Sequence, residues 1–435
     1  MRSTRRHLDR HAGGLLALLA CTAGVMASTS CSSARDDAAE AAPVDASAEP
    51  SSQLDAGSDG TPNGSPSDAG TFDGGPLTVE CDSPSCAVSL ASSRGESFCA
   101  LLHDGTVVCW GANANGELGR GETTTGSATP ARVVGLSDIV TLDHTCAVDR
   151  NGGAWCWGTG PFLQGDGGVT TESAPVKLAL PPAKKVSVYQ RTGCALVDDG
   201  VVCWGSNEFG QVAPDAPFMR EPSHPPRAVP FGPGAPIRDV AVNEASFIVR
   251  EDGVSESWGV NGLVARETSL FPDPVSLPTT LPPTSAVDAV ESRACVAAEG
   301  DSFCWGNDVG VTPRRVSAPE PVVQIATTPT FLDKSRYPNV LLPSRWCAAA
   351  ISGSVYCLGD NNAGQAGDGT KNHAVRPVKI AGLPGRVAQV RTTRDATCAL
   401  LTSGEIYCVG SNYYGQLGDE KMRRSSLEPV KVSLP

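Results

Sequence analysis

Short apolar runs separated by glycine-containing turns recur along the chain from about residue 88 onward. In the clearest case Cys99-Ala-Leu-Leu precedes the pair Asp104-Gly105, and Val-Val-Cys109-Trp110 follows it. Two apolar runs on either side of an Asp-Gly pair are typical of a β-hairpin. The pattern therefore predicts antiparallel strands, and helix-favouring stretches are nearly absent after residue 80.

This hairpin occurs seven times, and the residue that closes it is followed each time by glycine. The intervals between successive closing residues are 47, 47, 54, 47, 53 and 51. A repeat of about fifty residues built on two apolar runs and a turn is typical of a β-propeller blade. The closing residues are Trp110, Trp157, Trp204, Trp258, Trp305, Leu358 and Val409.

Each repeat also contains a second turn, a strand that begins near a proline and a further short apolar run. In the first repeat these are Asn113 to Gly119, the strand near Pro130, and Ile139 to Leu142. Glycine and asparagine suit the turn because both tolerate a positive φ. Four short strands in each of seven repeats predict an all-β fold, a seven-bladed β-propeller of four-stranded blades over residues 79–435.

The two ends of the repeat region suggest how the ring closes. The hairpin from Cys99 to Cys109 has no clear proline-led strand before it, and the strand from Pro429 to Val432 has no hairpin after it. We therefore expect the C-terminal strand to complete the first blade, which begins near Val88. Such a strand would remove an open sheet edge, which is otherwise an aggregation hazard.

Twelve of the sixteen cysteines form six pairs, one in each hairpin except the fourth. The fourth hairpin has Phe247 and Ser257 at these positions, so both members of its pair are missing together. Directly opposed residues of two antiparallel strands have Cα atoms about 4.5–5.5 Å apart, which is within disulfide range. The expected disulfides are Cys99–Cys109, Cys146–Cys156, Cys194–Cys203, Cys295–Cys304, Cys347–Cys357 and Cys398–Cys408.

Two other uses of these cysteines stay open, namely a zinc site and free buried thiols. Zinc would need closely spaced ligands that converge, whereas these pairs lie in separate repeats. Cys81 and Cys86 are expected to form a small seventh disulfide loop. Each hairpin disulfide would stabilise the fold by roughly 2–3 kcal/mol by restricting the unfolded chain.

Residues 1–31 have the organisation of a lipoprotein-type signal peptide. Four arginines precede a small and apolar stretch, Gly13 to Ala27, which is too short and too interrupted to span a membrane. Leu18-Leu-Ala-Cys21 resembles the lipobox of bacterial lipoproteins, in which the cysteine becomes the lipid-modified first residue. Cys31 is the alternative lipidation site, and an ordinary cleaved signal is the other interpretation. We expect a lipid-anchored protein of the cell envelope, periplasmic or on the surface, or a secreted protein if no lipid is attached.

Residues 32–78 consist almost entirely of Ala, Ser, Asp, Gly, Pro and Thr, which predicts a disordered acidic linker. Of the net charge of −13, residues 1–31 contribute +3 and residues 32–80 contribute −9, which leaves −7 for residues 81–435. A mildly acidic domain without a Lys/Arg run is a poor partner for phosphates, so nucleic acid is not expected as a partner. The lipid anchor is the only membrane contact expected.

The sequence offers little that would support catalysis. It contains no GxSxG, P-loop or HExxH motif, and the histidines of the repeat region are isolated from one another. Asp104, Asp198 and Asp252 lie in hairpin turns and are best interpreted as turn residues. We therefore expect neither an enzyme nor a cofactor or metal.

Aromatic and apolar residues in the second turns are the sharper candidates for binding. Propeller symmetry would place them around one rim of the ring, where exposed side chains can anchor a partner. Local packing within each turn is the alternative interpretation. An insertion from Thr328 to Trp346 could also bind a ligand, because long loops often carry function. The candidate rim residues are Phe162, Phe209, Leu263, Tyr413 and Tyr414.

The hairpin together with Asn412-Tyr-Tyr-Gly415-Gln-Leu-Gly418 resembles the repeat of the regulator of chromosome condensation family. The resemblance covers residues 88–435 and implies a seven-bladed propeller of four-stranded blades. The eukaryotic namesake is an exchange factor for a nuclear GTPase and binds nucleosomes, and an exported protein has access to neither. A secreted bacterial relative inhibits β-lactamases by laying the propeller face on the enzyme, which shows that the fold can bind extracellular proteins.

The sequence is thus best interpreted as an exported, monomeric binding propeller whose ligand is an extracytoplasmic protein or glycan. One alternative is an inhibitor of a secreted enzyme such as a β-lactamase, and another is a glycan-active enzyme that uses the central channel. Charged residues that converge on the channel would favour the enzyme. A hydrophobic patch on the rim would favour the binding functions.

Overall fold

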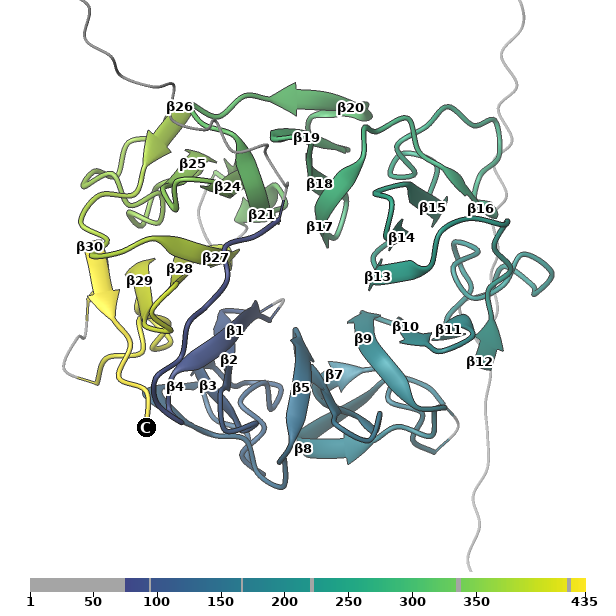
Figure 1. Ribbon diagram of the computed structural model, residues 1–435, viewed down its shortest axis with the longest axis horizontal. Helices are drawn as coiled ribbons and strands as arrows, with labels where there is room; N and C mark the ends of the chain where they lie inside the picture. Colours follow the sequence, from purple (N-terminus) through teal and green to yellow (C-terminus); the bar gives the residue numbers. More distant parts are fainter. Residues whose placement is uncertain (1–74, 94, 166, 220–222, 334–337, 421–423) are drawn as a thin grey trace, which may run out of the picture. The chain divides into compact units, whose positions relative to one another are not determined.

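The computed structural model describes residues 75–435 except 94, 166, 220–222, 334–337 and 421–423. The predicted signal peptide, both candidate lipidation sites and nearly all of the predicted linker lie outside the described residues. Every regular element within the described residues is a β-strand. The strands form seven four-stranded antiparallel sheets that are arranged as blades around a central channel (Figure 1).

The first four blades follow one another along the chain. Blade one contains β1 (Ala87–Ser92), β2 (Ser97–Leu102), β3 (Val107–Ala112) and β4 (Gly126–Arg132). Blade two contains β5 (Ile139–Asp143), β6 (Cys146–Asp149), β7 (Ala154–Gly160) and β8 (Thr170–Lys177). Blade three contains β9 (Ala183–Tyr189), β10 (Thr192–Val197), β11 (Gly200–Gly205) and β12 (His224–Ala228). Blade four contains β13 (Ile237–Ala241), β14 (Ala245–Arg250), β15 (Ser255–Gly259) and β16 (Asp273–Pro278).

The last three blades include one insertion. Blade five contains β17 (Thr284–Val290), β18 (Arg293–Ala298), β19 (Asp301–Gly306) and β20 (Gly310–Val316). Blade six contains β21 (Val322–Thr328), β24 (Arg345–Ala350), β25 (Val355–Gly359) and β26 (Ala374–Lys379). The short hairpin of β22 (Phe331–Asp333) and β23 (Val340–Leu342) is inserted between β21 and β24. Blade seven contains β27 (Val387–Thr392), β28 (Ala396–Leu401), β29 (Ile406–Gly410) and β30 (Ser426–Lys431).

The predicted seven four-stranded blades are confirmed, but the predicted closing strand is wrong. The C-terminal strand β30 pairs with β29 of its own blade, where Val430 lies opposite Cys408. Blade one is complete without it, because β4 supplies its outer strand. Each proline-led strand belongs to the hairpin that precedes it in the chain. Each of the seven hairpins therefore pairs with its own proline-led strand, and no strand of one blade completes another.

The two ends of the blades differ. The loops that join first to second strands, and third to fourth strands, lie at one end, which we call the loop face. The tight turns that join second to third strands lie at the other end, which we call the hairpin face. This division matters because loops can vary in length without disturbing the sheets.

Neighbouring blades are joined by the tryptophans that close the hairpins. The indole Nε1 of each donates a hydrogen bond to a backbone carbonyl in the second turn of the preceding blade, and all five indoles are buried. Trp110 makes this bond across the seam between blades one and seven. The five bonds join Trp110 to Gln416 (2.9 Å), Trp157 to Glu117 (2.8 Å), Trp204 to Pro161 (2.5 Å), Trp258 to Gln211 (2.8 Å) and Trp305 to Leu263 (2.8 Å).

Blades six and seven close their hairpins with aliphatic residues, and a buried arginine of the preceding blade joins them instead. Arg293 of β18 donates through Nε to the Thr327 hydroxyl of blade six at 2.9 Å. Arg345 of β24 donates to the carbonyls of Thr393 and Ala396 in blade seven, at 2.5 and 3.0 Å. Burial lowers the pKa of Arg345 to about 10, and the carbonyl acceptors offset part of the cost of burying its charge.

Polar side chains add to the seam between blades seven and one. Gln389 of β27 accepts a hydrogen bond from the backbone N–H of Leu90 in β1 at 2.9 Å. Glu96, in the loop between β1 and β2, accepts from the Thr393 hydroxyl at 2.7 Å and from the Gln416 amide at 3.2 Å. Burial raises the pKa of the Glu96 carboxyl. The ring is therefore closed by side-chain contacts and by no shared strand among the described residues.

The segment before β1 forms a strap, residues 75–86, across the hairpin face. Pro76 borders the same hollow as the turn between β14 and β15 in blade four. Glu80 then donates its backbone N–H to the carbonyl of Thr402, in the turn between β28 and β29 of blade seven, at 2.8 Å. Figure 1 shows this segment passing β27 before it enters β1. The strap thus leads the chain away from the centre of the hairpin face to the seam.

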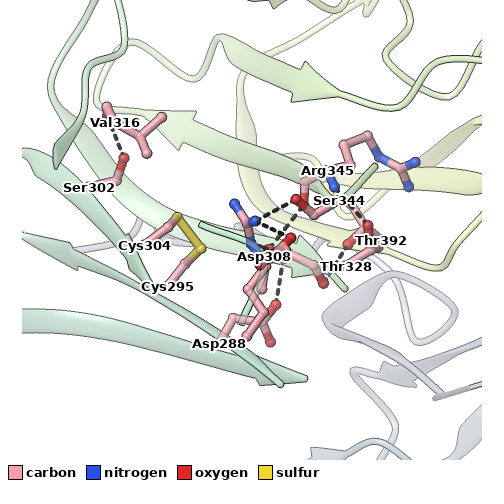
Figure 2. The surroundings of a disulfide bond; sticks show 12 residues. Asp288, Cys295, Ser302, Cys304, Asp308, Val316, Thr328, Ser344, Arg345 and Thr392 are labelled. Carbon is pink, nitrogen blue, oxygen red and sulfur yellow. Dashed lines mark hydrogen bonds and ion pairs between the residues drawn. A yellow bond between two sulfur atoms is a disulfide. The ribbon is translucent and has the colours of Figure 1, made fainter. Parts of the chain in front are cut away.

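All seven predicted cysteine pairs form disulfides in the structure. The six hairpin pairs lie directly opposite each other in the strand register, with Cα–Cα distances of 4.0–4.1 Å. Figure 2 shows Cys295–Cys304, which joins β18 to β19. The Cys81–Cys86 disulfide closes a loop within the strap. In blade four Phe247 lies opposite Ser257 in the corresponding register, as the pattern of paired loss requires.

We expect Trp110→Phe to lower the free energy of unfolding by about 1–3 kcal/mol, because the buried Gln416 carbonyl would lose its hydrogen-bond donor. Urea unfolding monitored by circular dichroism measures this loss. Trp346→Phe is the matched control, because Trp346 is buried but its Nε1 has no hydrogen-bond partner. Equal losses in the two variants would show that indole volume, and not the hydrogen bond across the seam, stabilises the ring.

Candidate functional site

The structure separates the five candidate rim residues into three groups. Phe162 and Leu263 have exposed fractions of 0% and 1%, so the prediction that they could anchor a partner is wrong. Phe209 and Tyr414 are half-buried, and only Tyr413 is fully exposed, at 83%.

The two buried residues lie where the second turn departs from the common pattern. Phe162 packs in the same cluster as Trp204, and Leu263 in the same cluster as Trp305. Each side chain thus fills the interface with the next blade. Local packing, the alternative interpretation, holds for these two positions.

Tyr413 and Tyr414 occupy the turn between β29 and β30 on the loop face. Their rings meet edge to face, with centroids 4.7 Å apart. The side chain of Gln416 accepts the Tyr414 backbone N–H at 2.8 Å, and Ser411 Oγ accepts that of Tyr413 at 3.3 Å. Side chains within the turn therefore fix its backbone, while the ring of Tyr413 projects into solvent.

The inserted hairpin of blade six presents further apolar side chains on the loop face. Leu332 and Leu341 lie opposite each other in the β22–β23 register, and both are exposed. The exposed Phe331 ring lies under Arg394 of blade seven, whose guanidinium carbon is 4.5 Å from the ring centroid. The insertion from Thr328 to Trp346 has two other aromatic residues. Trp346 is buried in β24, and Tyr337 lies outside the described residues.

Arg394 connects the hairpin to the tyrosine turn. Burial opposes the ionisation of Arg394, but Asp395, whose carboxylate lies 3.0 Å from the guanidinium, raises its pKa. Tyr414 also contributes to the raised pKa of Arg394, so its side chain lies within electrostatic range of the guanidinium. A guanidinium over an aromatic ring is a favourable cation–π arrangement. We call this set of residues the aromatic patch: Phe331, Leu332, Leu341, Arg394, Tyr413 and Tyr414.

A second exposed apolar group lies on blades three and four. Phe271 has an exposed fraction of 75%, and Phe218 and Leu270 are also exposed. Phe218 and Pro274 both lie close to Gly210, which shows that the two loops meet at the blade boundary. The sequence analysis missed this group, although an apolar pair directly before Pro272 was a visible signal.

The centre of the ring holds a cavity with a volume of about 260 Å³. Residues from the first strands of all seven blades line it, and Pro76 of the strap borders it as well. Lys185 of β9 is the main cation of one wall, with Nζ 2.7 Å from Asp239 of β13 and 3.9 Å from Asp143 of β5. His144 Nδ1 lies 2.8 Å from Asp143 Oδ1.

Burial and charge act in opposite directions on these groups. Burial opposes the ionisation of Asp143, but Lys185 and His144 outweigh it and lower the pKa of Asp143. Burial would likewise lower the pKa of Lys185, but Asp239 and Asp143 raise it. For Asp288 of β17, burial is the largest effect and raises the pKa of the carboxyl. The Lys185 cluster is therefore held in its charged form.

The sequence analysis missed the charged lining of this cavity. A single charge within an otherwise apolar first strand, such as Asp288 in Ala-Val-Asp-Ala-Val, was the available signal. Charged residues that converge on the channel were named above as favouring an enzyme. Lys185 and His144, however, are engaged by carboxylates of the ring itself, and such pairing favours a structural role for them.

Two other features bear on the chemistry of the described residues. They include no group of three or more His, Cys, Asp or Glu side chains that could hold a metal ion. They also include no helix with the length and apolar character needed to cross a bilayer.

The fold and its bonds define a class of protein, a disulfide-bonded seven-bladed β-propeller with an elaborated loop face. Models of the regulator of chromosome condensation (RCC1) repeat match residues 183–211, 352–400 and 387–416. The chain therefore contains RCC1 repeats, at these residues.

Known proteins with this repeat are distant in sequence. The chain is 26% identical over 216 residues to the ultraviolet-B receptor UVR8 of Arabidopsis thaliana, a match that covers 46% of this chain and 47% of UVR8. It is 37% identical over 73 residues to the human E3 ubiquitin-protein ligase HERC2, which is 17% of this chain and 2% of HERC2. The chain thus matches about half the length of UVR8 and a small part of HERC2.

Solved structures share the fold. Yeast RCC1 (Prp20), in its complex with Kap60, aligns with a TM-score of 0.62 at 17% identity, over 76% of this chain and 84% of the yeast chain. Human WBSCR16 aligns with a TM-score of 0.58 at 18% identity, over 76% and 95% of the two chains. At these identities the likeness concerns the propeller fold alone.

We expect Lys185→Met to lower the free energy of unfolding by about 2 kcal/mol at pH 7, because it removes the only ion-pair partner of Asp239 among the described residues and leaves Asp143 with His144 alone. The pKa of Asp143 is lower in the folded than in the unfolded protein, where it is about 3.9. Asp143 therefore stabilises the fold at pH values above about 3.9, and this contribution is lost as the pH falls toward the folded pKa. The difference between wild type and variant should therefore narrow below about pH 4, as measured by urea unfolding across pH.

Lys184→Met is the matched control for this substitution. Lys184 forms an exposed ion pair with Asp198, and such a pair contributes about 0–1 kcal/mol. A loss as large as that of Lys185→Met would contradict a specific role for the cavity cluster.

Proposed function

We propose that this chain is an exported binding propeller of the cell envelope, and that it captures a protein partner on the aromatic patch of its loop face. RCC1-repeat propellers are typically binding or regulatory domains, which supports the general class. The aromatic patch is the observation that carries the choice of a protein partner. It combines exposed aromatic and leucine side chains with an arginine, the residue types that dominate the energetics of protein interfaces.

The position of the strap supports the use of the loop face. The chain enters the described structure at Gly75 and Pro76, beside the hairpin turns of blades four and five. A lipid on Cys21, or alternatively on Cys31, would therefore tether the ring from its hairpin face through residues 32–74. The aromatic patch lies at the opposite ends of the strands, so the point where the linker joins the ring leaves this patch uncovered.

The disulfides support export. Seven disulfides in one chain are typical of an oxidising compartment outside the cytoplasm. Access to nuclear GTPases or histones would not exist there, so the partner must be another extracytoplasmic protein. An inhibited secreted enzyme is one form that such a partner can take. The exposed patch supports this binding class over a glycan-active enzyme in the channel.

Replacing aromatic patch residues is expected to weaken partner binding. A photo-crosslinking amino acid at position 413 in the native envelope should trap the partner, and the same probe at position 271 should not. Affinity for the trapped partner should then fall at least about ten-fold in a Phe331→Ser, Tyr413→Ser variant, because exposed anchors are lost. Phe271→Ser removes an exposed ring from blade four and serves as the control. Unchanged affinity in the double variant, or loss in the control alone, would contradict the proposed surface.

Anchoring is tested separately. Cys21→Ser should move the protein from the membrane fraction to the soluble fraction and remove labelling by a fatty-acid analogue, because the lipid attaches through that thiol. Cys31→Ser should leave both readouts unchanged. The reverse result would assign the anchor to Cys31. A wild-type protein that takes up no fatty-acid label and does not fractionate with the membrane would contradict lipid anchoring.

A further inference from the structure

Two opposite charges in the central cavity have no ionic partner, in contrast to the Lys185 cluster. Arg391 of β27 makes one hydrogen bond, from Nη1 to the carbonyl of Val390 at 3.1 Å. Asp288 of β17 accepts one, from the backbone N–H of Thr327 at 2.6 Å, and Figure 2 shows its carboxylate beside the first strands of blades five and six. Among the described residues that line the cavity, the ion pairs are those of Asp143 with His144 and of Lys185 with Asp143 and Asp239, so neither Arg391 nor Asp288 takes part in one.

The two charges nevertheless face the same space. Both side chains line the cavity. Burial raises the pKa of the Asp288 carboxyl, and Arg391 is the charge that opposes this most strongly. A guanidinium has five N–H donors, so Arg391 retains most of its capacity. Unpaired charges in a partly desolvated space are costly unless a ligand compensates them.

The rest of the lining limits the chemistry of that ligand. Lys185 is already neutralised by Asp143 and Asp239, and Arg238 donates to the carbonyls of Arg250, Thr284 and Ser285. Arg238 takes no part in the ion pairs of the described lining either, but these carbonyls occupy its Nε and Nη2 donors. Arg391 and Asp288 are therefore the two groups with the most capacity left for a ligand. The remaining wall is small and apolar, with Ala241, Val242, Ala286 and Ala289 among its residues.

The size and shape of the cavity favour a small molecule. A volume of about 260 Å³ is below the range of roughly 300–1,000 Å³ typical of drug-sized ligands. Pro76 borders the cavity on the side of the hairpin face, where the strap crosses. His144 and Ser92 border it toward the loop face.

We propose that the central cavity binds a small zwitterion of the free amino-acid class. Arg391 would hold the carboxylate, Asp288 would hold the ammonium group, and the alanine and valine wall would contact the side chain. A guanidinium–carboxylate contact is the stronger of the two, because it is charge-assisted and can be bidentate. This inference is independent of the partner proposed for the aromatic patch.

The remaining lining argues against two other ligand classes. A phosphate would meet three aspartates, while two of the three Lys and Arg side chains in the lining, Lys185 and Arg238, already donate to acceptors of the ring. A divalent cation would find Lys185 between two of those aspartates, and the described residues contain no cluster suited to a metal.

Isothermal titration calorimetry on the full-length protein tests the zwitterion site. A panel of free amino acids should include at least one that binds. Two matched compounds, one lacking its ammonium and one lacking its carboxylate, should each bind at least about ten-fold more weakly, because each deletes one charge-assisted contact. Absence of binding across the panel, or equal binding of either truncated compound, would overturn the proposal, as would tighter binding of inorganic phosphate.

Substitutions assign the contacts. Arg391→Gln and Asp288→Asn should each weaken the zwitterion at least about ten-fold while leaving the thermal transition in the absence of ligand close to that of wild type. Arg376→Gln, an exposed arginine on the outer strand β26, is the matched control and should bind normally. The Phe331→Ser, Tyr413→Ser variant should also bind the zwitterion normally, which separates a failure of this site from a failure of the aromatic patch. Unchanged affinity in Arg391→Gln would show that the zwitterion does not bind in the central cavity.

Discussion

The hydrogen bond between a buried indole and the preceding blade is the interaction on which the ring depends. A single blade cannot bury both of its faces, so each must pack on a neighbour. The indole supplies a large apolar surface together with one donor, and the second turn supplies the carbonyl that this donor needs. Because Trp110 makes the same contact with Gln416 as Trp157 makes with Glu117, the first and last blades are joined as any other pair is.

The exceptions to this rule lie beside the elaborated part of the loop face. Where blades six and seven lack the tryptophan, Arg293 and Arg345 take over the contact from the preceding blade. A buried guanidinium must find several acceptors. Backbone carbonyls of the next blade provide them for Arg345, whereas Arg293 bonds to the Thr327 hydroxyl and pairs with Asp308. The same blades carry the inserted hairpin and the tyrosine turn, so an altered interface accompanies the proposed partner surface.

The propeller also separates two kinds of chemistry in space. The loop face varies from blade to blade without disturbing the sheets, which allows an aromatic patch to form over blades six and seven. The channel is built from first strands whose positions are fixed by the ring, so its charges are held in place. A large partner surface and a small-molecule cavity therefore coexist on one scaffold.

Local pattern in the sequence determined the strands, the repeat number and the disulfides. Short apolar runs, an Asp-Gly turn and the joint loss of two cysteines at Phe247 and Ser257 all depend on residues close together in the chain. Only the tertiary structure decided the ring closure, the exposure of each turn residue and the pairing of the channel charges. Tyr414 and Phe162 occupy equivalent turn positions, yet Tyr414 is half-buried and Phe162 is fully buried, because the neighbouring blade decides what each contacts.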